Sequence, residues 1–162
     1  MRARLRELPR ETFSDEDRQK LRLLSDVFVE QLREYDFGSF SDERLSISRD
    51  DYLPRREEFD LQADISASDS IRVIWAYLLG LLEVSRQFAT NHPGLLIFDE
   101  PRQQSAKDLS FAALLKRAAA DGVGRQIVFA TSESLESLDK MLAGVPHRLL
   151  IVDGFMLRPV EG

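Results

Sequence analysis

The sequence predicts an α/β domain in which a mostly parallel sheet is flanked by helices. In the second half of the chain, short apolar runs typical of strands alternate with longer segments of helical periodicity. Such alternation favours a parallel sheet with both faces covered, and ligands of such sheets bind at the carboxyl ends of the strands. The length of 162 residues fits one domain, or at most two small lobes, and 43% apolar residues suffice for a core.

Composition narrows the classes of function. The formal net charge of −6 argues against a general affinity for nucleic acid or membrane, although it leaves room for a local basic patch. The absence of cysteine removes disulfides, thiolate zinc sites and a cysteine nucleophile, and two histidines argue against a histidine-rich metal site. The most apolar stretch holds only ten residues between Arg72 and Glu83, whereas a membrane span needs about 20. We therefore expect a soluble, cytoplasmic protein without a membrane partner.

The first element is a predicted helix over residues 14 to 35. Ser14 can cap it, acids follow at positions 15 to 17, and Gly38 lies where the helix should stop. The helical spacing is carried by Leu21, Leu24, Phe28, Leu32 and Tyr35. This helix either packs in the ordinary way against the rest of the domain or forms the root of a coiled coil. We therefore divide the chain into a helical segment over 1–38 and a lobe over 39–162.

The next elements are two predicted strands and a long helix. One strand contains Leu45 and Ile47, and the other runs from Phe59 to Ile65, with apolar and polar residues alternating in both. A charged loop containing a proline joins them. The apolar helix follows over residues 69 to 90.

The remaining elements alternate between strand and helix. A turn at 92–94 precedes a short buried strand, "LLIF", and a helix over 105–120 ends at Gly122 or Gly124. A second buried strand, "RQIVFAT", follows. Then comes a helix that Ser132 can cap and Gly144 can end. The segment "HRLLIVDG" is predicted to be a third strand, with "FMLRPV" beside it.

Two adjacent acids end the first buried strand, in "LLIFDEP". A carboxylate held there, as at Asp99, suits Mg²⁺, bound directly or through water. Glu100 points to the other side of the chain and can orient or deprotonate a water molecule. This pair suits metal-assisted phosphoryl transfer to water. The alternative is a strand end whose acids cap the next turn.

Two further segments place small or hydroxyl residues where a phosphate could bind. In "ISASDSIR", small residues precede the most apolar helix, whose N-terminal amides and dipole attract anions. In "VFATSES", Thr131 and Ser132 follow a strand and could contact a γ-phosphate. The alternative in both places is ordinary helix capping, by Ser66 or Ser68 in the first and by Ser132 in the second.

The order of these segments resembles the C-terminal half of an ABC-type ATPase head, and more narrowly the SMC-like and RecN-like ATPases of chromosome maintenance and DNA repair. "ISASD" stands in register with the signature motif, and "LLIFDEP" with the Walker B strand. "RQQSAKD" lies where the D-loop is expected, and Thr131 or Ser132 occupies the position of the switch histidine. The resemblance covers residues 45 to 160.

The resemblance implies ATP and Mg²⁺ as ligands of an assembled head. Asp99 would hold Mg²⁺ through water, Glu100 would position the attacking water, and Thr131 or Ser132 would sense the γ-phosphate. The nucleotide-binding residues implied are Ser66, Ala67, Ser68, Asp69, Gln104 and Ser105. ATP would join two heads, and hydrolysis would release them, in DNA repair, chromosome handling or phage defence. DNA would be a further partner.

The chain departs from the family pattern at several positions. Ala67 and Ser68 replace the signature glycines, no switch histidine is present, and Ala106 occupies the place of the D-loop aspartate, with Asp108 too far along. No G-x-x-x-x-G-K-[ST] loop occurs, and none of the four lysines follows a glycine. The β-phosphate would therefore be bound by an N-terminal Walker A lobe, on the same or a separate chain.

Two other hypotheses fit parts of the pattern. A non-catalytic interaction module with an ATPase-like fold would explain the missing Walker A loop and switch histidine, but it has no use for both acids. A receiver-like phosphoacceptor domain would use Asp99 and Thr131, but it needs a lysine after the last strand, and "HRLLIVDG" offers none.

Overall fold

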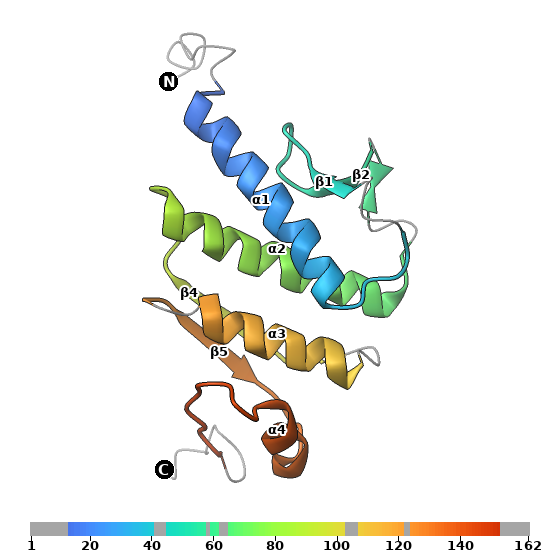
Figure 1. Cartoon of the computed structure of the whole chain (residues 1–162), viewed down its shortest axis with the longest axis vertical. Coiled ribbons are helices and arrows are strands. Elements are labelled where there is room, and N and C mark those ends of the chain that lie inside the picture. The colour runs from blue at the N-terminus through green and yellow to red at the C-terminus, as the bar shows by residue number, and fades with distance from the viewer. Residues whose placement is uncertain are drawn as a thin grey trace, which may run out of the picture.

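The computed structural model of the chain describes residues 13–40, 45–57, 59–61, 65–102, 107–121 and 124–152. Within them it forms a small α/β domain of four helices and two small sheets (Figure 1). The predicted α/β class is confirmed. None of the described helices is both long and apolar enough to cross a bilayer.

Helix α1 (Asp15–Glu34) begins where the sequence predicts. Ser14 and Asp17 form a reciprocal capping box, a device that stabilises a helix by about 1 kcal/mol. The helix ends earlier than the glycine at position 38 suggested. Asp36 adopts φ 59°, and the amide of Phe37 donates to the carbonyl of Leu32 at 3.0 Å, so a left-handed aspartate closes the helix.

Helix α2 (Ala67–Gln87) forms the centre of the core. It packs against α1, and a Cβ at Gly80 would lie 3.0 Å from Cδ1 of Leu24, so the missing side chain permits close approach of the two helices. Trp75 is 1% exposed and lies between Tyr35 and Phe111, with ring centroids 5.9 and 6.2 Å away. The core thus joins α1, α2 and the third helix, while the division at residue 38 stays a prediction.

The first sheet is antiparallel and contains β1 (Leu45–Ile47), β2 (Pro54–Arg56) and β3 (Phe59–Asp60). The prediction of two strands is right for β1 and for the start of the second. Strand β2, which lies within the expected loop, was not predicted. Ile65 lies in a bend before α2 rather than in a strand, and Ala63 lies outside the described residues.

The second sheet is parallel. Strands β4 (Leu95–Asp99) and β5 (Gln126–Ala130) pair side by side, with Phe98 opposite Phe129. Helix α3 (Asp108–Asp121) forms the crossover connection between them. Phe111 of α3 packs edge-on against Phe129, with ring centroids 6.3 Å apart. These pairs confirm the predicted strand–helix–strand unit.

Helix α4 (Leu135–Met141) completes the described elements. Its N-cap is Ser134, whose side chain accepts from the amide of Ser137, so the prediction of Ser132 as cap is wrong by two residues. Gly144 follows the helix with φ 75°, a left-handed conformation that glycine adopts without strain.

Among the described residues, the parallel sheet is covered on one face only, which corrects the prediction of buried strands. Leu95, Ile97 and Val128 are 40%, 64% and 37% exposed, because the strands alternate and no described element covers their side of the sheet. The expected third strand is also absent from the described residues. Residues 147–152 are irregular, their four apolar side chains from Leu149 to Val152 are exposed, and "FMLRPV" lies outside the described residues.

Candidate functional site

The carboxyl ends of β4 and β5 place the predicted acids and hydroxyls at one edge of the sheet. Asp99 pairs with Ala130 in the last register of the ladder, so Glu100 and Thr131 are the first residues beyond it. The Oγ of Ser132 donates to Oε2 of Glu100 at 3.2 Å. The structure therefore brings together a predicted catalytic acid and a predicted phosphate sensor from two strands.

Glu100 has an unusual backbone. Its φ is 43°, and its amide donates to the carbonyl of Ala130 at 2.8 Å, which extends the ladder by one bond. A left-handed conformation costs a non-glycine residue about 1–3 kcal/mol, and a following proline, here Pro101, further disfavours it. A non-glycine residue in such a strained conformation is a feature that clusters at functional sites.

Asp99 lies exposed at the strand end. It forms no hydrogen bond or ion pair with any described residue. No group of three His, Cys, Asp or Glu side chains within the described residues could hold a metal ion. Asp99 therefore fits Mg²⁺ only where phosphate oxygens and water complete the shell, which is how proteins usually bind this ion.

Thr131 and Ser132 differ in their local roles. Thr131 is half-buried, and its Oγ1 accepts from the amide of Glu133 at 3.3 Å. Ser132 is exposed and does not cap α4. Of the two, the hydroxyl of Ser132 is the better placed to contact a ligand beside Glu100.

Arg102 connects the segments that follow the two strands. Its guanidinium donates to Glu133 at 2.9 Å and also pairs with Asp108 at the start of α3. This residue was not predicted from the sequence. The available signal was an arginine immediately after "DEP". Gln104 and Ser105, predicted in the D-loop, lie outside the described residues, as does Ala106.

The segment in register with the signature motif begins α2. Ser66 is the N-cap and accepts from the amide of Asp69 at 3.1 Å, so the capping interpretation holds for this serine. Its Oγ also lies 3.2 Å from Oγ of Ser68. Ser66 and Ala67 are exposed and Ser68 is half-buried, which leaves this helix start open to an anion.

Asp69, which was predicted to bind nucleotide, is buried, at 3% exposure. Its carboxylate accepts from Arg72 and from the hydroxyl of Ser39, both at 2.5 Å, and from the amide of Gly38 at 3.3 Å. Burial raises the pKa of Asp69, but the hydrogen bonds from Ser39, Arg72 and Gly38 outweigh it, so this pKa is lowered from 3.8. The buried carboxylate of Asp69 therefore holds the start of α2 against the segment that follows α1.

The same network extends from α2 to α3 and α1. Arg72 donates to Oγ of Ser110 at 3.2 Å, and Ser110 donates to the carbonyl of Tyr35 at 2.7 Å. The start of α2 is thereby held against the start of α3, on the side of the sheet where the strands end. No hydrogen bond joins Ser66 or Ser68 to Asp99 or Glu100 within the described residues.

Comparison of the chain with known protein families, with curated proteins and with solved structures finds no match.

Proposed function

We propose that this chain is the C-terminal lobe of an SMC-like, ABC-type ATPase head that acts in the cytoplasm. The proposal rests on one observation above all. Glu100, in a strained backbone after a strand-end aspartate, accepts a hydrogen bond from Ser132 on the neighbouring strand. An acid pair beside a hydroxyl at the carboxyl edge of a parallel sheet is suited to binding and hydrolysing a metal-bound phosphate.

Each residue has a defined task in this proposal. Asp99 holds Mg²⁺, which neutralises phosphate charge when it is bound together with ATP. Glu100 orients the attacking water, and Ser132, with Thr131 behind it, senses the γ-phosphate. The exposed start of α2, at Ser66 to Ser68, contacts the γ-phosphate of a second head. The lack of contact between this segment and Asp99 is compatible with a site shared between two heads.

The partner implied is an N-terminal Walker A lobe, on the same or a separate chain. The uncovered face of the parallel sheet supports it, because Leu95, Ile97 and Val128 expose apolar area that a second layer would bury. The exposed residues Leu149 to Val152 add further apolar surface that a partner could bury.

The test begins with capture of the native polypeptide from its source cells through its C-terminus. We expect a polypeptide with a mass above 18.5 kDa, or a second chain, that carries a Walker A sequence. The captured assembly should hydrolyse ATP. With Glu100→Gln, it should retain ATP and accumulate as a dimer.

Glu136→Gln is the matched control, because Glu136 is exposed in α4 and its partner among the described residues is the exposed Lys140. This variant should turn over ATP at the unmodified rate. If the Glu100→Gln assembly also did so, Glu100 would have no catalytic role. If the captured assembly neither contained a Walker A sequence nor bound ATP, the ATPase proposal would fail, and the non-catalytic interaction module would replace it.

A further inference from the structure

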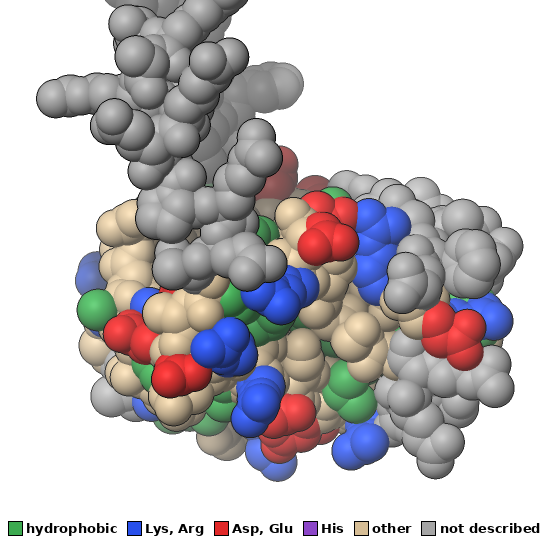
Figure 2. All heavy atoms as spheres, turned by 90° about the horizontal axis from the view of Figure 1, so that it is seen from above, with side chains coloured by type: hydrophobic (Ala, Val, Ile, Leu, Met, Phe, Trp, Pro, Cys, Tyr) green, Lys and Arg blue, Asp and Glu red, His purple; other side chains and the backbone are tan. Residues whose placement is uncertain are grey.

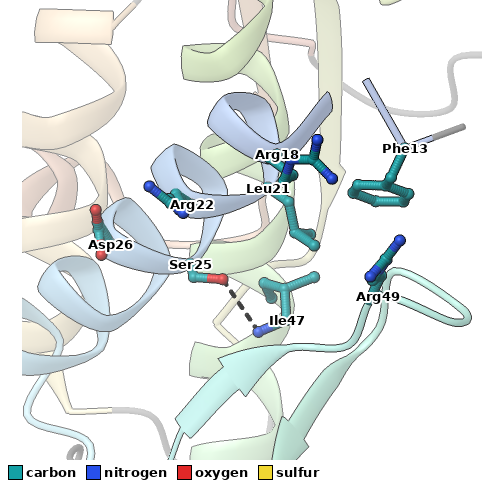
Figure 3. A pocket seen from close by; sticks show the side chains of 8 residues that line it. All are labelled: Phe13, Arg18, Leu21, Arg22, Ser25, Asp26, Ile47 and Arg49. Carbon is teal, nitrogen blue, oxygen red and sulfur yellow. Dashed lines mark hydrogen bonds between the residues drawn. The ribbon is translucent and has the colours of Figure 1, made fainter. Parts of the chain in front are cut away.

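A second candidate site lies between α1 and the β1–β2 hairpin, far along the chain from the strand-end acids. It is an open pocket of about 340 Å³ with an apolar floor and a basic rim (Figure 3). Phe13, Leu21 and Ile47 form the apolar part, and Arg18, Arg22 and Arg49 supply three guanidinium groups. Its volume is in the range of small-ligand pockets.

The two walls of the pocket are fixed relative to each other. Oγ of Ser25 on α1 accepts from the amide of Ile47 on β1 at 3.2 Å, as the dashed line in Figure 3 marks. Behind the hairpin, the hydroxyl of Tyr77 on α2 donates to the carbonyl of Tyr52 at 2.9 Å. The backbone segments that carry the arginines of α1 and of the hairpin are therefore held on either side of a preformed space.

Aromatic rings extend from the pocket to the tip of the hairpin. The guanidinium of Arg49 lies 4.5 Å from the ring centroid of Phe13, which is stacked with Tyr52 at 6.2 Å and 13°. Tyr52 is 51% exposed and has φ 61°, a conformation that costs a tyrosine energy. An exposed aromatic stack of this kind offers a flat surface to another planar ring.

The charge of the pocket favours an anion. Arg18 is paired with Asp15 at 2.8 Å, but Arg22 has no ion pair with any described residue, and Asp26 is the only acid among the described lining residues. Figure 2, which views this end of the molecule, shows Lys and Arg interspersed with Asp and Glu rather than gathered in one broad basic patch. This pattern fits a few localised phosphate contacts better than a duplex backbone tracked over a wide surface.

We propose that this pocket binds one nucleotide unit of a single-stranded nucleic acid. The base packs against Phe13, Leu21 and Ile47, the flanking phosphates contact Arg22 and Arg49, and the next base stacks on Tyr52. Aromatic platforms beside basic side chains are the combination that binds single strands with little sequence preference. The inference does not depend on the ATPase proposal, since the two sites share no residue.

The test measures binding of a fluorescent oligothymidylate to the full 162-residue chain by anisotropy, without ATP, over a series of salt concentrations. The double variant R22A/R49A should weaken binding by roughly tenfold or more. The slope of the logarithm of the binding constant against the logarithm of the salt concentration should also become shallower, by about 0.7 for each phosphate that the variant no longer neutralises. Phe13→Ala should weaken binding as well, and Phe13→Tyr should restore it.

The matched control is K116A/R148A. It removes the same charge from two exposed side chains that do not line the pocket. Equal weakening in the control and in R22A/R49A, or no binding by the unmodified chain at low salt, would overturn the proposal.

Three competitors test the chemistry of the ligand. Displacement by polyglutamate at equal charge concentration would show that the pocket selects charge alone. Displacement by AMP at equal nucleotide concentration would assign the pocket to free nucleotides. Either result would overturn the single-strand proposal. Displacement by duplex DNA as strong as by single strand would contradict the base pocket. Failure of all three to displace the oligonucleotide supports the single-strand proposal.

Discussion

Ser132 donates a hydrogen bond from its Oγ to Oε2 of Glu100 at 3.2 Å, and the two residues come from the ends of two paired strands. The backbone of Glu100 reaches back to the carbonyl of Ala130 at 2.8 Å with φ 43°. The carboxylate position is thus set from both its backbone and its side chain. Such double restraint is what a residue that orients water requires.

The first prediction concerns the strain at Glu100. Glu100→Gly should increase the free energy of unfolding of the 162-residue chain by about 1 kcal/mol, because glycine adopts a positive φ without steric cost. The gain should appear although the variant removes a side chain and its hydrogen bond with Ser132. Urea denaturation followed by circular dichroism measures it.

The comparison variant is Asp99→Gly, one residue earlier. Asp99 is the last residue of β4 and, unlike Glu100, does not have a positive φ. Glycine should therefore destabilise the chain there by about 0.5–1 kcal/mol. If both glycine variants destabilised the chain equally, the backbone at Glu100 would carry no strain, and the presence of glutamate there would need no functional reason.

Much of the fold follows from local patterns in the sequence. Ser14 with its first-turn acids, the apolar periodicity of α2 and the run "LLIF" each specify an element whose structure depends mainly on near neighbours. Strand β2 could not be predicted, because Pro54–Arg56 has no strand pattern and is ordered by pairing with β1. The uncovered face of β4, here called the bare face, could not be predicted either, since an apolar run does not reveal whether one or two layers cover a strand.

The candidate site was predictable to a similar extent. Asp99, Glu100 and Ser132 share an edge because strand ends of a parallel pair must meet there. Asp69 was assigned to a ligand, but its burial depends on Ser39 and Arg72, and nothing in the spacing of "ISASDSIR" identifies the distant serine. Arg102 was missed because nothing local shows that it joins Asp108, six residues away, to Glu133, 31 residues away.

A second prediction follows from the buried ion pair. Asp69→Asn should lower the free energy of unfolding by about 3–5 kcal/mol at neutral pH, because it leaves the buried guanidinium of Arg72 without its counter-charge. Asp139→Asn, in the exposed part of α4, should have no measurable effect. Chemical denaturation of the three proteins under one set of conditions makes the comparison.

The same pair predicts a pH dependence. The pKa of Asp69 is lowered from 3.8 in the folded chain, so the unfolded chain binds its proton first as the pH falls. The stabilisation is complete above about pH 4 and is lost as the pH drops through the lower folded pKa. The unfolding free energies of the unmodified chain and of Asp69→Asn should therefore converge in acid. A difference that stayed constant to the lowest accessible pH would contradict the ionised pair.

A third prediction concerns Arg117, which joins three helices. It lies in α3 and pairs with Glu83 of α2 at 2.8 Å and with Glu34 and Glu30 of α1 at 3.0 and 3.3 Å. Arg117→Met should cost about 1–3 kcal/mol at low salt, because the side chain is only 14% exposed, and less at high salt. Lys140→Met, which breaks an exposed pair in α4, should change stability by less than about 0.5 kcal/mol. An effect of Arg117→Met as small as that of Lys140→Met, or one that did not depend on salt, would show that the ion pairs of Arg117 do not stabilise the fold.

The final prediction compares the two faces of β4 through substitutions of two neighbouring residues. Phe98 is 5% exposed and stacks on Phe129 at 5.0 Å, so Phe98→Ala should cost about 3–5 kcal/mol of unfolding free energy. Ile97 points to the bare face at 64% exposure, so Ile97→Lys should leave the stability of the isolated chain within about 0.5 kcal/mol.

Ile97→Lys should have a large effect when a partner is present. If a Walker A lobe covers the bare face, Ile97→Lys places a charge in that interface and should greatly reduce recovery of the lobe in the C-terminal capture, as measured by quantitative mass spectrometry. Leu109→Lys is the matched control, because Leu109 is 80% exposed on α3, away from the bare face. Unchanged recovery with Ile97→Lys would show that the partner binds elsewhere, whereas strong destabilisation of the isolated chain by this variant would show that the face is already covered.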